Sequence, residues 1–147
     1  MTDIAFHFNV PDKLAYACRL LRKASAAGGP VGVVAPPAAL QELDAALWSF
    51  SALDFIPHCT ASAAADVLAA SPIVLAPECA ALAHAGVLVH LGEQVPAGFE
   101  RFARLIELVD TSDNDRAQAR LRWRYYAERG YAIQRHDLAS RHANNDA

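Results

Sequence analysis

Short, mostly apolar runs alternate along the chain with segments whose apolar residues recur every three or four positions. Uninterrupted apolar runs bounded by turn residues are typical of parallel strands that are buried on both faces. They predict five strands, over residues 4–10, 31–35, 73–76, 87–91 and 105–110. The stretch from 49 to 70 shows neither periodicity clearly, and residues 55–58 in it are expected to form a loop with apolar content.

Helical spacing predicts the elements between these strands. The first helix follows Pro11-Asp12, where the Asp12 side chain can cap it, and it ends at the turn residues 28–30. The other helices are expected over residues 38–48, 99–103 and 113–129, the last closed by Gly130. Strands that alternate with helices predict one α/β domain, an open and mostly parallel sheet with helices on both faces. This domain is expected to cover residues 1–135, and the polar residues 136–147 are expected to fray.

The first strand–helix turn lacks the chemistry of a nucleotide site. It is Asn9-Val10-Pro11-Asp12, without the glycines that let a backbone approach phosphate closely. The sequence has no GxSxG motif. It also has no paired metal-ligand spacing: His84 and His90 flank a predicted strand and would lie about 20 Å apart along it, too far to share one metal ion. We therefore expect neither catalysis nor a bound metal or cofactor.

Charge changes this picture at one end of the chain. The whole chain is weakly acidic, with 13 Lys+Arg, 16 Asp+Glu and a net charge of −3, which argues against a general binder of polyanions. No Lys or Arg occurs between Lys23 and Arg101, whereas the C-terminal segment is rich in arginine. Such asymmetry favours a localised acidic partner, although a solvated helix face would give the same pattern.

Other compositional features point to a cytoplasmic protein. The three cysteines are far apart in the sequence, as expected of reduced thiols. No basic and then apolar N-terminal segment indicates a secretory signal, and no apolar run approaches the roughly 18 residues of a spanning helix. We therefore expect no membrane contact.

The last predicted helix carries the most informative pattern. Arg120, Trp123, Arg124 and Ala127 share one stripe by their spacing, and Arg122, Tyr126 and Arg129 form the neighbouring one. Two guanidinium groups beside an indole suit a ligand that has a carboxylate next to an aromatic ring. The alternatives are single-stranded nucleic acid, with arginines on phosphates and aromatics on bases, or an indole that faces the sheet.

A second segment is also unusual. Leu43-Asp44-Ala45-Ala46-Leu47-Trp48 is followed by Phe55-Ile56-Pro57-His58. Trp48 could complete the core or could lie at an interface.

Together these blocks resemble the chi subunit of bacterial DNA polymerase III, an accessory protein of the clamp loader. The resemblance is carried by LDxALW…FxPH at residues 43–58 and by ARxRWRYYxxxGY at residues 119–131, with weaker agreement at residues 6–8 and 98–110. Their order and spacing cover nearly the whole chain.

The resemblance implies a Rossmann-like, non-catalytic subunit that acts in DNA replication. It implies two partners: the acidic, Phe-terminated C-terminal tail of single-stranded DNA-binding protein, and the psi subunit, which tethers chi to the clamp loader. DNA would be contacted only indirectly. The tail would bind at Arg120, Trp123, Arg124 and, more weakly, Tyr126, while the psi subunit would bind at Phe55, with Trp48 and Pro57 as its neighbours.

Overall fold

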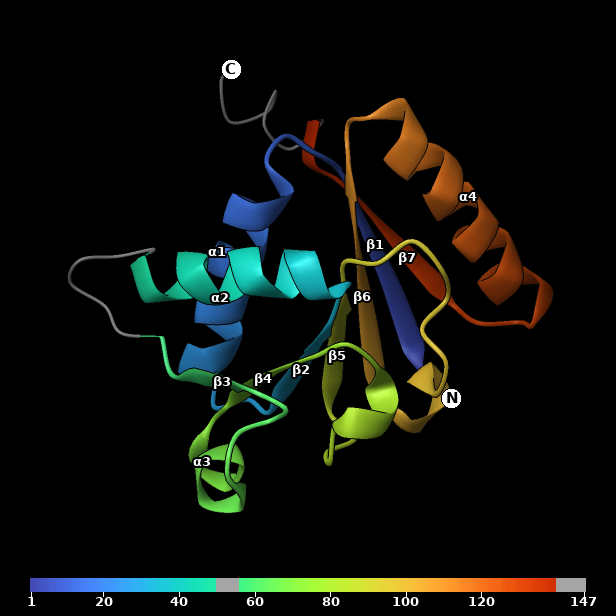
Figure 1. Ribbon diagram of the computed structural model, residues 1–147. Helices are drawn as coiled ribbons and strands as arrows, with labels where there is room; N and C mark the ends of the chain where they lie inside the picture. Colours follow the sequence, from blue (N-terminus) through green and yellow to red (C-terminus); the bar gives the residue numbers. More distant parts are fainter. Residues whose placement is uncertain (50–55, 140–147) are drawn as a thin grey trace.

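The computed structural model describes residues 1–49 and 56–139. Seven parallel strands form one sheet in the order β3-β4-β2-β5-β6-β1-β7 (Figure 1). The strands are β1 (Asp3–Val10), β2 (Val31–Val34), β3 (His58–Thr60), β4 (Ile73–Ala76), β5 (Val87–His90), β6 (Arg104–Asp110) and β7 (Ile133–Asp137). The helices are α1 (Lys13–Ala26), α2 (Pro37–Ser49), α3 (Ala65–Ala70) and α4 (Asp113–Glu128), with 3-10 turns at Cys79–Ala81 and Phe99–Arg101.

Helices cover both faces of the sheet, so the predicted α/β class is confirmed. Helices α1 and α2 lie on one face and α4 on the other, as Figure 1 shows. Each face has its own core: Leu21, Leu43 and Leu75 belong to the first, and Phe6 and Phe99 to the second. No helix in the described ranges is long and apolar enough to cross a membrane.

The five predicted strands are confirmed, and the structure adds two. The first, β3, has only three residues and begins at His58, the last residue of the expected loop. The second, β7, forms the opposite edge and reads Ile-Gln-Arg-His-Asp, a polar sequence without an apolar run. An edge strand needs no such run, because one of its sides faces water. This strand continues to Asp137, two residues past the expected end of the domain.

Helix α4 begins and ends as its sequence predicts. The side chain of Ser112 accepts a hydrogen bond from the backbone N–H of Asp115 and so caps the first turn. After the helix, Gly130 adopts a positive φ of 81°, which glycine tolerates without strain. This turn lets the chain return along the sheet as β7, beside β1.

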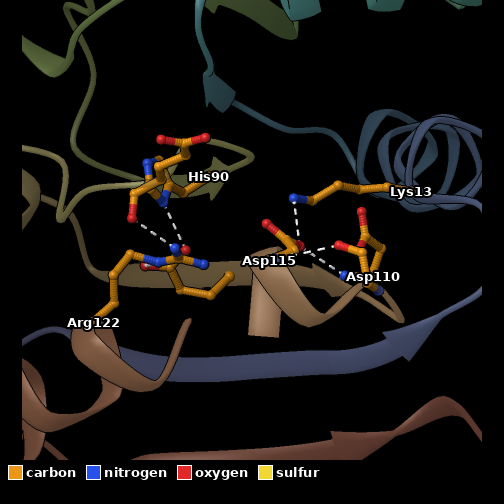
Figure 2. Close-up of polar contacts among 8 residues, drawn as sticks. Lys13, His90, Asp110, Asp115 and Arg122 are labelled. Carbon is orange, nitrogen blue, oxygen red and sulfur yellow. Dashed lines mark hydrogen bonds and ion pairs between the residues drawn. The ribbon is translucent and has the colours of Figure 1, made fainter. Parts of the chain in front are cut away.

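A buried polar cluster joins α4 to the sheet. Glu107 of β6 is fully buried, and its carboxylate is 2.6 Å from His90 Nδ1, 2.6 Å from the Tyr126 hydroxyl and 3.2 Å from Arg122 Nε. Arg122 also donates from Nη1 to the backbone carbonyl of Glu93 at 2.8 Å. In Figure 2, His90 and Arg122 approach each other from β5 and α4. The cluster therefore fixes how α4 is rotated about its axis.

Candidate binding groove

A groove of about 810 Å³ runs along α4 where this helix faces β1 and β7. Its apolar floor comes from β1 and the end of β6, one wall comes from α4, and the other wall comes from β7. The side chains that line it are Phe6, Phe8, Asn9, Val109, Arg116, Ala119, Arg120, Trp123, Arg124, Ala127, Glu128 and Arg135.

Aromatic rings form the centre of the groove. Phe6 is buried, and its ring centroid is 5.1 Å from that of Trp123 at an interplanar angle of 54°. Trp123 is half-buried, so one part of the indole packs on the sheet while another part lines the groove. This floor suits an aromatic or aliphatic side chain, because a second ring can pack edge-on or offset against it.

Arginines surround this floor. Arg120 and Arg124 are exposed on α4, and Arg135 is exposed on β7. In the described part of the chain, none of the three forms an ion pair with a carboxylate. The guanidinium of Arg135 instead lies 5.4 Å from the Phe8 ring centroid and 5.8 Å from that of Trp123. A ligand with carboxylates would supply the missing negative charges.

A fourth arginine is held by the protein itself. Arg116 donates from Nη2 to the side-chain oxygen of Asn9 at 2.9 Å, and Asn9 donates to Asp137 at 2.9 Å. Asn9 has a positive φ of 58°, a conformation that asparagine adopts more readily than most residues. These contacts tie the ends of β1 and β7 to α4 at one end of the groove.

The structure brings together three of the four residues predicted to bind a partner tail. Arg120, Trp123 and Arg124 all line the groove, but Tyr126 does not. Tyr126 is fully buried on the adjacent face of α4, and its hydroxyl donates to Glu107. Burial, with the neighbouring Glu107 carboxylate, raises the pKa of this phenol, which stays protonated as the donor.

Other groove residues were not found from the sequence. Phe6 and Phe8 alternate along the first strand, a pattern that placed them in a strand but not in a site. Arg135 lies four residues beyond the ARxRWRYYxxxGY block, in a polar segment that gave no strand signal. Only the sheet pairing of Arg135 with Phe6 brings it to the groove.

The second predicted surface lies at the other edge of the sheet. Trp48, near the end of α2, is 59% exposed, and its ring centroid is 4.9 Å from that of His58 in β3. The buried His58 is held by Asp44 Oδ1 at 2.9 Å and by the carbonyl of Ile56 at 2.8 Å. Trp48 is therefore displayed on the surface and is not part of the core. Pro57, which directly precedes His58 in the chain, is half-buried, and Phe55 lies outside the described residues.

At the carboxyl ends of β1 and β6 lies the carboxylate of Asp115, a side chain of the protein itself. Asp115 Oδ2 accepts a hydrogen bond from the backbone N–H of Asp110 at 2.8 Å and pairs with Lys13 Nζ at 2.9 Å (Figure 2). In open α/β sheets this edge is where ligands usually bind. Here a side chain of the protein takes the N–H and the positive charge that a bound phosphate would use.

Comparison with known proteins gives a consistent result. Residues 1–134 match the family model described as DNA polymerase III chi subunit, HolC. The chain is also 36% identical over 127 residues to the DNA polymerase III subunit chi of Pseudomonas aeruginosa, with 86% of this chain and 87% of that protein covered.

Proposed function

The chain belongs to the DNA polymerase III chi subunit family of non-catalytic accessory subunits in DNA replication, and on this basis we propose that its groove binds the acidic, Phe-terminated C-terminal tail of single-stranded DNA-binding protein. One observation carries the proposal. The arginines Arg120, Arg124 and Arg135 surround an aromatic floor and have no carboxylate partner within the described ranges.

The chemistry of such a tail matches both parts of the groove. Its terminal ring would pack on Trp123 and the phenylalanine floor, and its terminal carboxylate would accept hydrogen bonds from Arg120 and Arg124. A few charge-assisted bonds and one buried ring make a small interface. Micromolar affinity, or about −8 kcal/mol, is therefore expected.

Single-stranded nucleic acid is the competing ligand, and the shape of the aromatic floor disfavours it. The floor is confined to one groove, whereas single-strand binders commonly stack successive bases along a channel. The net charge of −3 and the Glu128 carboxylate do not separate the two ligands, because both ligands are negatively charged.

The test is fluorescence anisotropy of a labelled peptide that copies the tail. We expect Arg120→Ala and Arg124→Ala each to weaken binding by about 30-fold, or ~2 kcal/mol, as for a central arginine in an interface. Arg129→Ala is the matched control, because Arg129 is exposed at the C-terminal cap of α4 but stacks 3.5 Å from the Tyr125 ring centroid, outside the groove. Binding should also weaken as salt rises.

Two outcomes contradict the proposal. One is the absence of saturable peptide binding by the unaltered protein. The other is binding that Arg129→Ala weakens as much as Arg120→Ala does. A labelled oligonucleotide is titrated in parallel, and oligonucleotide binding without peptide binding would favour the nucleic-acid function.

The exposed Trp48 supports a second contact, which we assign to the psi subunit of the clamp loader. Large exposed aromatic side chains are enriched at protein interfaces, and this one is held by a buried histidine beside an edge strand. Pro57 and Phe55 would complete the surface, as the family resemblance implies.

Replacing Trp48 by Ala is expected to weaken the association with a psi subunit by at least tenfold, the effect of removing an interface aromatic that contributes ~1.4 kcal/mol or more. Isothermal titration calorimetry measures it. Leu121→Ala is the control, because Leu121 is 58% exposed, much like Trp48, but lies on α4. An equal loss in both variants would remove the basis for this assignment.

A further inference from the structure

We propose that Arg135 binds an acidic side chain of the ligand that precedes its terminal residue, so that the groove recognises two separate negative charges. The inference rests on the proposed tail binding and goes beyond it. It concerns a residue outside both sequence blocks that carried the family resemblance.

The position of Arg135 follows from strand pairing. It lies opposite Phe6 in the parallel pair of β1 and β7, and residues paired in this way point to the same face of a sheet. Phe6 contacts Trp123, so this face is the one that α4 covers. Arg135 therefore stands on the wall of the groove opposite Arg120 and Arg124, with the aromatic floor between them.

The guanidinium of Arg135 is oriented by the rings and not by a counter-ion. It lies over Phe8 and Trp123 at centroid distances of 5.4 and 5.8 Å. Stacked guanidinium groups keep their in-plane N–H groups available for a carboxylate. No acidic partner of Arg135 occurs in the part of the chain that the structure describes.

A single terminal carboxylate leaves the positive charge of Arg135 unmatched. Arg120 and Arg124 are one helical turn apart on the same wall, so one terminal carboxylate can lie between their two guanidinium groups. The residue with that carboxylate also places its ring on the floor. Arg135, across the floor, is left for a carboxylate on a preceding residue, which an acidic tail supplies.

The experiment combines protein variants with a peptide series. The peptides are the tail sequence with a free C-terminus, the same sequence with a C-terminal amide, and a set in which each acidic side chain is replaced by its amide. Each is titrated against the unaltered protein, Arg120→Ala, Arg135→Ala and Arg135→Lys. Arg104→Ala is the control, because Arg104 is an exposed strand arginine that does not line the groove.

We expect Arg135→Ala to weaken binding of the unmodified tail by about tenfold, the low end for a hydrogen bond to a charged group. This penalty should vanish for one peptide that lacks a particular acidic side chain, and it should persist for the C-terminal amide. For Arg120→Ala the reverse is expected. Arg135→Lys should recover only part of the affinity, because lysine keeps the charge but not the planar stack.

Three results would overturn the inference. If Arg120→Ala weakens binding and Arg135→Ala does not, tail binding stands and the role of Arg135 is wrong. If the Arg135→Ala penalty is the same for every peptide, Arg135 acts by holding Trp123 in place and not by binding an acidic side chain. In that case Arg135→Ala would change the fluorescence of Trp123 without peptide, measured in a Trp48→Phe background. If the unaltered protein binds no tail peptide, the proposed function fails together with the inference.

Discussion

Replacing Glu107 by Gln is expected to lower the free energy of unfolding by about 3–5 kcal/mol, the cost of removing one partner from a buried ion pair. The change keeps the size of the side chain but leaves the guanidinium of Arg122, only 1% exposed, without its negative partner. It also replaces the carboxylate oxygens that face His90 and Tyr126. Urea unfolding followed by circular dichroism measures the loss.

Glu93→Gln provides the matched control for this variant. Glu93 is exposed, and its contact with Arg122 is made by the backbone carbonyl, which the substitution leaves in place. We therefore expect its unfolding free energy to change by less than about 0.5 kcal/mol, as for ordinary surface sites. If Glu107→Gln were as mild as this control, the cluster would not be what holds α4 on the sheet.

The same carboxylate predicts how stability depends on pH. Burial alone would raise the pKa of Glu107, but the positive charge and hydrogen bond of His90, with Arg122 and Tyr126, outweigh burial and lower it. A carboxyl whose pKa is lowered by folding stabilises the protein above the ordinary glutamate pKa. This contribution is lost as the pH falls below about 4.3 and through the folded pKa, so the Gln variant should lose less stability in acid.

The second large effect is expected at Phe99. Its ring is 1% exposed and lies 5.1 Å from the ring centroid of Tyr126 and 5.3 Å from that of Tyr131. Tyr126 belongs to α4 and Tyr131 follows the Gly130 turn toward β7. Phe99→Ala removes the ring that both tyrosines pack against, so a loss of about 3–5 kcal/mol in unfolding free energy is expected.

A more conservative substitution distinguishes the loss of ring contacts from a general failure to fold. Phe99→Leu keeps an apolar side chain of intermediate size, and its cost should be about 1–2 kcal/mol. The comparison uses denaturant unfolding at one temperature for all three proteins. An alanine variant that is no less stable than the leucine variant would show that the ring contacts contribute little.

The strands that could be predicted from the sequence are those that are buried in the sheet and therefore consist of an apolar run. Residues 31–34 and 73–76 lie inside the sheet, and every one of these residues is buried. Strand β7 could not be found in this way, because an edge strand tolerates charge and its identity depends on pairing with β1. The three residues of β3 are too short for any periodicity to show.

The same limit applies to the groove. Helical spacing grouped Arg120, Trp123 and Arg124, and the structure places all three in one groove. Spacing also grouped Arg122 and Tyr126 with Arg129, but it could not show that the side chains of Arg122 and Tyr126 are buried while Arg129 is exposed. That outcome depends on Glu107, a single carboxylate within an apolar strand whose burial and partners appear only in three dimensions.

The strand order also determines how far apart the groove and the exposed Trp48 lie. The groove lies beside β1 and β7, and Trp48 lies against β3, so six strand spacings separate the two edges of the sheet (Figure 1). At about 4.8 Å per spacing this is roughly 30 Å. Two ligands held at such a distance do not compete for space, and neither has to leave before the other arrives. The sheet would then work as a rigid spacer, which raises the local concentration of one partner near the other without any change of shape.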